Sequence, residues 1–486
     1  MKRQVKPVTQ TADQTVNLKP SFDQVRRFWQ SPEVEQALLY ADVESNIAHV
    51  RMLGETGIVD KLTAHDVIAA LRQIGAELER GMQLLEPNDI DIHSAIHRRL
   101  HHMLGDQADV VRIAKSHNDQ IATDIRLFLR DATIDIFENI LDVRRALIEL
   151  AHRDLEVVMP GYTHMQPAMP ILLSHWWLAN EARLRRDFSR LQDFYKRMNA
   201  LPLGACQLAG TDQPIDRQLV AQYLGFDAVM ENSLDAVSDR DYLIEFAACA
   251  SLIGVHLSQM SSELLLWSTQ EFGFVRLPRA FVFRSQSMPH KRNPELLEIL
   301  RSRPSVLNGR LAQFLNELKG LSVSYSQDLQ ESLPGLLDVV ENLRFILELI
   351  HVLLPAFKFD TVRMQLLASS DLTNAGHAVD FLVERDMSAD KASKVIDTIL
   401  TYCRERTKSL PDLTLNEWIQ FSPAFNEDIY NYVKVEEAVD SRTSYGGTGG
   451  EQVEQSLRRT VQLHETDRLF MNGIASKRLN CQESDS

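Results

Sequence analysis

The feature that most constrains this chain is a long segment without glycine or proline, from residue 106 to residue 159. Within it, apolar residues recur at steps of three and four positions, which is the period of an amphipathic α-helix. A helix of about 30 residues extends over about 45 Å, so it cannot bury its apolar stripe inside one small globule. The stripe consists of Ile121, Ile125, Leu129, Ile136, Ile140, Val143, Leu147 and Leu150.

The same spacing predicts further long helices over residues 171–200, 226–252 and 336–354. Helices of this length bury their stripes in a long bundle, or in a bundle that several subunits share. Glycine contributes only 20 of 486 residues, below the usual ~7%, which argues against a β-sandwich or barrel. The apolar stretch 246–267 contains His256 and Glu263, so we interpret it as a buried core helix rather than a membrane span.

We divide the chain into three parts. Residues 1–115 form an N-terminal domain of shorter helices, and residues 116–365 hold the long-helix bundle. Residues 366–486 form a C-terminal domain, in which we again expect short helices.

Charge and cysteine content narrow the classes of function. The net charge of −15 argues against non-specific nucleic-acid binding, because that binding depends on basic patches. A cleft can still carry a local positive field and bind an anionic small molecule. The four cysteines form no CxxC pattern, and we expect reduced thiols in a cytoplasmic protein.

Polar clusters lie between the predicted long helices. In the first, Ser116 and Asp119 have the spacing of a helix N-cap, and Asn118 adds an amide at a helix start, where anions bind. In the second, Pro160-Gly161 predicts a turn between two helices, and His164 follows it. Histidine titrates near neutrality and suits general acid–base catalysis, although a single loop histidine is more often a surface residue.

The third cluster runs from Phe283 to Pro294 and combines hydroxyl, amide and three basic side chains before a helix that carries Glu298. Such a loop suits a dianionic substrate, and the alternative is a solvated basic loop. Separately, His93, His97 and His101 share one helix face. Because no carboxylate or cysteine accompanies them at ligand spacing, we favour a polar helix face and expect no metal.

Together these clusters resemble one family. The segments SHNDQIATD, PGYTHMQPAMP, LAGTDQPIDR, ENSLDAVSDRD, SMPHKRNP and RTSYGGT follow the order and spacing of argininosuccinate lyases, within the fumarase/aspartase superfamily. The run DVESNIAH at residues 42–49 also fits, and the resemblance extends over about residues 35–465.

The resemblance implies an all-α, three-domain fold with a central five-helix bundle. Four subunits would form a homotetramer with a twenty-helix core, and each active site would combine residues of three chains. It also implies a small-molecule substrate, argininosuccinate or a similar N-succinyl amine, which is split by β-elimination into fumarate and L-arginine or another amine. No cofactor, metal, nucleic acid or membrane is expected to take part.

The resemblance also assigns roles to residues. Ser285 matches the catalytic serine, which acts as the base on a mobile loop, and Lys291 and Asn293 match the residues that stabilise the anionic intermediate. His164 matches the catalytic histidine and Glu298 the carboxylate that orients it, although which of Ser285 and His164 is acid and which is base stays open. The positions that match substrate contacts are Ser45, Asn118, Thr163, Tyr325 and Gln330.

Several positions depart from the family pattern. Arg284 and Gln286 flank the serine where the family has glycine and serine, His117 replaces an arginine, and Leu333 replaces a lysine. Three alternatives therefore stay open: argininosuccinate cleavage, cleavage of another N-substituted aspartate, and a non-catalytic structural homologue like the lens crystallins. SMPHKRNP alone also resembles adenylosuccinate lyase, but RTSYGGT and ENSLDAVSDRD argue against that enzyme.

Overall fold

The computed structural model describes residues 32–86 and 89–483, and the chain divides into two compact units, Met1–Ile113 and Ala114–Ser486. Residues 1–31 of the predicted N-terminal domain lie outside the described residues. The division of the sequence into three domains stays a prediction. The helices of the first unit are α2 (Pro32–Glu35), α3 (Leu39–Glu55), α4 (Lys61–Glu79) and α5 (Ile92–Leu104), with 3₁₀ turns at Gln36–Leu38 and Gly105–Arg112.

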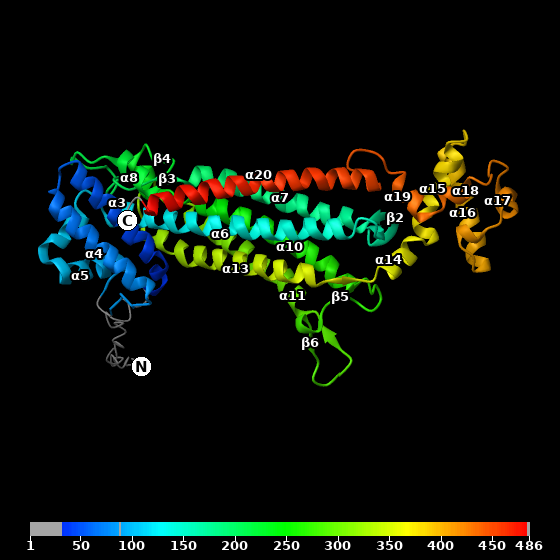
Figure 1. The fold of residues 1–486 in the computed structure, drawn as a ribbon, viewed down its shortest axis with the longest axis horizontal. Coiled ribbons are helices and arrows are strands. Elements are labelled where there is room, and N and C mark those ends of the chain that lie inside the picture. Colours follow the sequence, from blue (N-terminus) through cyan, green and yellow to red (C-terminus); the bar gives the residue numbers. More distant parts are fainter. Residues whose placement is uncertain (1–31, 87–88, 484–486) are drawn as a thin grey trace, which may run out of the picture. The chain divides into compact units, whose positions relative to one another are not determined.

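A bundle of long helices forms the centre of the second unit (Figure 1). α6 packs against α7, α13 and α20, while α10 packs against α7, α11, α12 and α13. The bundle is therefore the arrangement of long helices that the periodicity predicts, within the all-α fold that the resemblance implies. Its helices are α6 (His117–Arg153), α7 (Leu173–Met198), α10 (Asp241–Trp267), α11 (Glu295–Ser302), α12 (Pro304–Leu318), α13 (Ser332–Leu353) and α20 (Gly450–Glu483).

α6 shows why this sequence forms long helices. Ser116 caps its N-terminus in a reciprocal capping box with Asp119, and nothing in the next nine turns interrupts the hydrogen-bond ladder. All eight apolar residues of the predicted stripe are buried. The buried guanidinium of Arg144 contacts Glu181 of α7 at 2.9 Å and Asp467 of α20 at 2.7 Å, so one side chain joins three helices.

Two predicted elements differ from the structure. Residues 226–252 do not form one helix, because Asn232 caps the short α9 (Ser233–Ser238) and α10 begins only at Asp241. The C-terminal part does not contain only short helices, because α20 has 34 residues. α20 is largely polar and buries few apolar side chains, such as Val453 and Leu457, so apolar periodicity could not reveal it.

α10 is the helix among the described residues whose length and hydropathy would suit a membrane span. Its most apolar window is 56% buried inside the protein, and its neighbours in the bundle provide that burial, in agreement with a core helix.

Small helices follow the bundle and have a core of their own. Phe381, Ile396, Trp418 and Phe425 belong to this core and are each at most 3% exposed. The helices are α14 (Thr361–Ala368), α15 (Asp371–Val383), α16 (Ala389–Arg406), α17 (Leu415–Phe421), α18 (Ile429–Tyr432) and α19 (Val435–Asp440). The 3₁₀ turns of the unit lie at Arg279–Phe281, Gln327–Gln330, Leu354–Ala356 and Leu410–Asp412, and α8 (Arg217–Leu224) precedes α9.

The strands are short and occur in pairs. β1 (Val158–Thr163) and β2 (Gln166–Leu172) form an antiparallel hairpin with an irregularity at Gly161/Tyr162, directly after α6. β6 (Phe283–Arg284) pairs with β7 (Arg292–Asn293) and closes a loop that extends from the bundle in Figure 1. The other pairs are β3 (Ala200–Leu201) with β4 (Ala228–Val229), and β5 (Val275–Arg276) with β8 (Lys358–Phe359).

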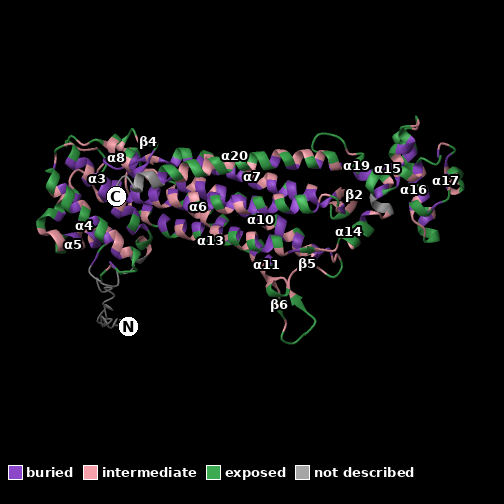
Figure 2. Cartoon of the chain, in the orientation of Figure 1, coloured by how far each residue is buried: buried purple, intermediate pink, exposed green. Residues whose placement is uncertain are grey.

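The bundle also exposes apolar side chains. Leu252 and Val255 of α10 are 40% and 37% exposed, and Phe345 and Val352 of α13 are 40% and 54% exposed. Figure 2 shows such exposed positions alternating with buried ones along the helices. α10 is apolar around most of its circumference, which is typical of a helix that is covered on every side.

Candidate active site

The first predicted cluster lies at the N-terminus of α6. The hydroxyl of Ser116 accepts a hydrogen bond from the Asn118 amide at 3.2 Å, and the carboxylate of Asp119 accepts one from the Ser116 amide at 2.8 Å. This confirms the predicted cap.

Asp119 does more than cap the helix. Its second oxygen accepts hydrogen bonds from the amides of Gly204 and Cys206, both at 2.8 Å, so it fixes the loop that follows β3. Burial of this side chain raises the pKa of Asp119 although three amides bond to it. The sequence indicated only the cap, since the partners lie more than 80 residues away along the chain.

Three predicted substrate-binding residues come together around this helix end. Asn118 donates from Nδ2 to the Gln207 carbonyl at 3.0 Å, and Gln330 donates to the Tyr325 hydroxyl at 2.9 Å. His117 joins the two segments: its Nε2 lies 3.4 Å from the Gln330 amide nitrogen, and its ring meets Tyr325 edge-on at 6.1 Å. The cluster thus presents amide, hydroxyl and imidazole groups at the positive end of a long helix dipole, a setting that suits an anion.

The second cluster forms the β1–β2 hairpin, and the structure corrects one detail of it. Pro160-Gly161 lies inside β1, and the turn is made by His164 and Met165 instead. Both have φ in the left-handed region, 52° and 60°, as a two-residue type I′ turn requires. This conformation is costly for residues other than glycine, and such strain concentrates at functional sites. Thr163 and His164 are therefore held exposed at a tight tip.

The third cluster forms the loop between β6 and β7. The Ser285 hydroxyl oxygen accepts a hydrogen bond from the Met288 amide at 3.2 Å and lies 3.4 Å from the Ser287 hydroxyl. Asn293 donates to Glu295 at 3.3 Å, while Lys291 and, on α11, Glu298 are exposed. The loop thus offers a hydroxyl and an ammonium group to a partner or ligand outside it.

Within one chain, the Asn118 cluster and the hairpin tip lie far apart. Asn118 lies at the start of α6 and the hairpin follows its end, so 37 helical residues, about 55 Å, separate Asn118 from Thr163 and His164. Among the described residues, no hydrogen bond or ion pair joins His164 to Ser285 or to Glu298. Asn118, Tyr325 and Gln330 form one group, the hairpin tip a second, and the serine loop a third.

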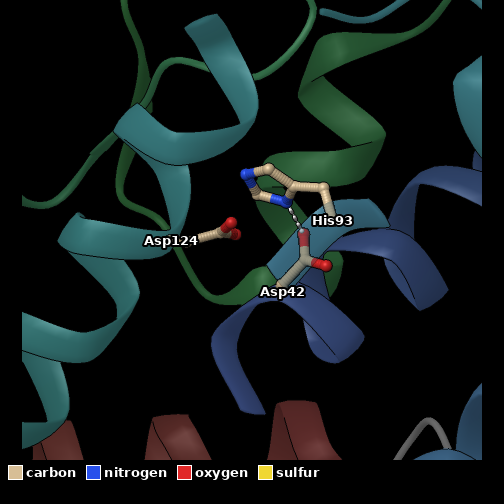
Figure 3. A group of neighbouring side chains, drawn as sticks. All are labelled: Asp42, His93 and Asp124. Atoms are coloured by element: carbon tan, nitrogen blue, oxygen red, sulfur yellow. Dashed lines mark hydrogen bonds and ion pairs between the residues drawn. The ribbon is translucent and has the colours of Figure 1, made fainter. Parts of the chain in front are cut away.

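The first unit holds Ser45 and the histidines of α5, and the contacts of these residues differ. Ser45 is buried in α3, and its hydroxyl donates to the Asp42 carbonyl at 3.0 Å. His93 lies 2.9 Å from a carboxylate oxygen of Asp42 (Figure 3), and His97 lies 2.9 Å from Asp109. The side chains of His93 and Asp42 are only 12% and 0% exposed, so a buried carboxylate from another helix accompanies His93. The spacing along the sequence did not indicate this pair, because Asp42 lies 51 residues from His93.

Other motif residues build the scaffold of the α6 end, a role that sequence reasoning missed. Arg217 of LAGTDQPIDR donates to the carbonyls of Leu203 and Met230 at 2.8 and 3.1 Å. Asp239 of ENSLDAVSDRD forms an ion pair with the buried Arg126. No local signal identified these roles, because both residues lie among other polar residues along the sequence.

The departures from the family pattern lie in different surroundings. Leu333 is only 4% exposed and packs within the bundle, whereas Arg284 is exposed and pairs with Arg292 across the β6–β7 strands. His117 lies in the Asn118 cluster itself, so it is the departure that the structure places nearest to predicted substrate contacts.

Comparison with known proteins defines the class first. Residues 18–309 match the family model described as lyase, and residues 372–440 match the one described as argininosuccinate lyase C-terminal. The fold agrees: EDDS lyase in complex with formate has a TM-score of 0.83 at 24% identity, with 94% of each chain covered. The class II fumarase of Schistosoma mansoni has a TM-score of 0.71 at 15% identity, with 84% of this chain and 91% of that one covered. The all-α fold of the fumarase/aspartase superfamily is thereby confirmed.

Proteins of similar sequence then identify the family within this superfamily. Argininosuccinate lyase of Synechococcus sp. strain JA-3-3Ab is 42% identical over 436 residues, which are 90% of this chain and 89% of that protein. Argininosuccinate lyase of Symbiobacterium thermophilum is 39% identical and covers 92% of this chain and 96% of its own length. The chain belongs to the argininosuccinate lyase family.

Proposed function

We propose that this protein is a carbon–nitrogen lyase that splits argininosuccinate into L-arginine and fumarate by general acid–base catalysis. The observation that carries the proposal is the family membership over nine-tenths of the chain, combined with retention of every reacting group. The groups are the hydroxyl of Ser285, the imidazole of His164, the ammonium of Lys291, the amide of Asn293 and the carboxylate of Glu298.

The chemistry begins with a weakly acidic Cβ proton of the succinyl group. Ser285 first loses its hydroxyl proton to solvent, and the Lys291 ammonium stabilises the resulting alkoxide. The alkoxide takes the Cβ proton as the base, and the electron pair of the C–H bond moves into the neighbouring carboxylate as an aci-carboxylate dianion. Lys291 and Asn293 stabilise that charge, which is the largest electrostatic demand of the reaction. The amide of Met288 already donates to the serine oxygen at 3.2 Å, and a donor in this place favours the deprotonated hydroxyl.

The second half of the reaction breaks the bond between Cα and nitrogen. The electron pair leaves with the nitrogen, fumarate forms, and His164 delivers the proton that the departing guanidinium nitrogen needs. Glu298 orients the imidazole. The type I′ turn supports this role, because it fixes the backbone of His164 at an exposed tip.

We also propose that the active protein is a homotetramer whose sites combine residues from several chains. Two observations support it. The helix α6 separates the Asn118 cluster from the hairpin tip by about 55 Å within one chain, and α10 and α13 expose apolar side chains that another subunit would cover. The tip, the serine loop and the Asn118 cluster can then meet around one substrate.

A second substrate is favoured by one specific observation. His117 stands among the predicted substrate contacts in place of an arginine, and Leu333, in place of a lysine, is buried. Each lost charge-assisted contact costs about 1.5–3 kcal/mol of binding. Cleavage of another N-substituted aspartate, with a different amine, is therefore the second candidate.

The deciding experiment measures fumarate release by its ultraviolet absorbance. Purified protein with argininosuccinate should produce fumarate and arginine in equal amounts. Activity with a different succinyl amine, and none with argininosuccinate, would move the assignment to the second candidate. If no succinyl amine yields fumarate, the protein is a non-catalytic structural homologue.

A further inference from the structure

A cavity of about 440 Å³ lies among the small C-terminal helices, apart from all predicted active-site residues. Its walls come from α15, α18, α19 and the loop that follows α19, all within the second unit. The volume lies in the range of sites that hold small organic molecules.

The cavity has two chemically distinct groups in its wall. One is the guanidinium of Arg442, which donates from Nη2 to Nε2 of His377 at 2.9 Å. His377 is only 4% exposed, and burial, together with the charge of Arg442, lowers the pKa of this imidazole. His377 therefore stays neutral and acts as an acceptor. Arg442 forms an ion pair with Asp380 at 3.7 Å, which is longer than a hydrogen bond.

The other group is acidic. Asp380, Glu384 and Glu437 line the same cavity, so its formal lining charge is −2 when Arg442 is counted and His377 is neutral. Glu384 accepts from the Tyr432 hydroxyl, which holds it in place. A ligand that fits must bring a cationic group to the carboxylates and an anionic group to the guanidinium.

The motif RTSYGGT, which the catalytic proposal does not use, fixes Arg442. The backbone folds back on the Arg442 carbonyl, which accepts from the Gly449 amide at 3.2 Å. A Cβ atom at Gly447 would lie 2.4 Å from that oxygen, so only glycine permits the approach. Further along, the Thr448 hydroxyl accepts from the Leu172 amide at 2.9 Å and ties the loop to the end of β2. The cationic side of the cavity is thus preformed.

We propose that this cavity binds a free basic amino acid, with its α-carboxylate at Arg442 and its side-chain cation at Glu437 and Glu384. A preformed guanidinium recognises a carboxylate by two parallel hydrogen bonds, and the surplus of acidic groups selects a cationic side chain over a neutral one. The inference does not depend on the proposed reaction, because the cavity contains none of its residues.

The test is calorimetric titration of the full-length protein with L-lysine. Two analogues test the contribution of each charged group to binding: norleucine lacks the side-chain cation, and cadaverine lacks the carboxylate. We expect saturable binding of L-lysine, at least about tenfold weaker binding of each analogue, and a similar loss for L-lysine in Glu437→Gln. Glu405→Gln, an exposed residue of α16 outside the cavity, serves as the matched control and should bind like the wild type.

Arg442→Gln provides a second variant, which should weaken the binding of L-lysine but not the binding of cadaverine. Fumarate release by Glu437→Gln should equal that of the wild type, which separates this site from catalysis. The proposal is overturned if L-lysine does not saturate at millimolar concentrations, if the three ligands bind alike, or if Glu437→Gln binds L-lysine as tightly as Glu405→Gln does.

Discussion

At the scale of single residues, the account depends most on Ser285. Its hydroxyl lies in a loop where the Met288 amide donates to the oxygen, and the proposed mechanism uses it as the proton acceptor. Ser285→Ala should reduce turnover of the succinyl substrate by at least about 100-fold, as expected for the loss of a general base. Steady-state fumarate release measures this. Ser287→Ala, two residues further along the same loop, is the matched control and should keep most of the activity; near-normal turnover of Ser285→Ala would refute the base assignment.

A second residue-scale prediction concerns pH. Burial, and then the neighbouring Asp239, raise the pKa of Asp241 from 3.8 to about 6. Because the folded pKa is the higher one, the contribution of Asp241 to stability is fully present below pH 3.8 and is lost as the pH rises through about 6. Asp241→Asn cannot ionise, so its stability relative to the wild type should increase between pH 5 and pH 8, by about 1 kcal/mol after solvent screening.

Urea midpoints at several pH values between 5 and 8 measure this difference. A gap between the two proteins that stays constant across this range would show that Asp241 does not carry the shifted pKa.

At the scale of elements, the hairpin that carries His164 is strained. Met165 has a φ of 60° at the second central position of the turn, where glycine is preferred. Met165→Gly should therefore raise the stability by about 1 kcal/mol, since the left-handed conformation costs roughly that much for a side chain. Thermal unfolding measures it. Met169→Gly, in β2 with ordinary backbone angles, should lower the midpoint; a lower midpoint for Met165→Gly as well would argue against the strained turn.

The elements also show what a sequence can predict. The long helices α6 and α7 follow from apolar spacing and from the absence of glycine and proline, because both signals are local. The apolar spacing also indicates α13, although Pro334 and Gly335 lie in its first turn. α20 was not predicted, because its long-range contacts, such as the ion pair of Arg478 with Asp131, are polar. The turn at His164 was not predicted, because Pro160-Gly161 is the stronger local turn signal.

The site shows the same division. Motifs predict which residues belong to the site. The contacts of Asp119 with Gly204 and of Asn118 with Gln207, however, join segments more than 80 residues apart. Such contacts depend on tertiary packing, and no local pattern encodes them.

At the scale of the whole molecule, the central claim is that a functional site needs more than one chain. The proposal of a shared site rests on the helix length that separates Asn118 from His164 and on the exposed apolar residues of α10 and α13. Size-exclusion chromatography with light scattering should accordingly report a mass of about four chains of 55.4 kDa. A stable monomer with full activity would contradict the shared site.

The most direct measurement of that claim is complementation between two inactive variants, His164→Asn and Ser285→Ala. Each variant alone is expected to be inactive. Co-expressed in one cell, they should form mixed tetramers in which some sites receive an intact His164 from one chain and an intact Ser285 from another. Fumarate release well above that of either parent is the predicted result, and verified mixed tetramers without any recovery would contradict the account.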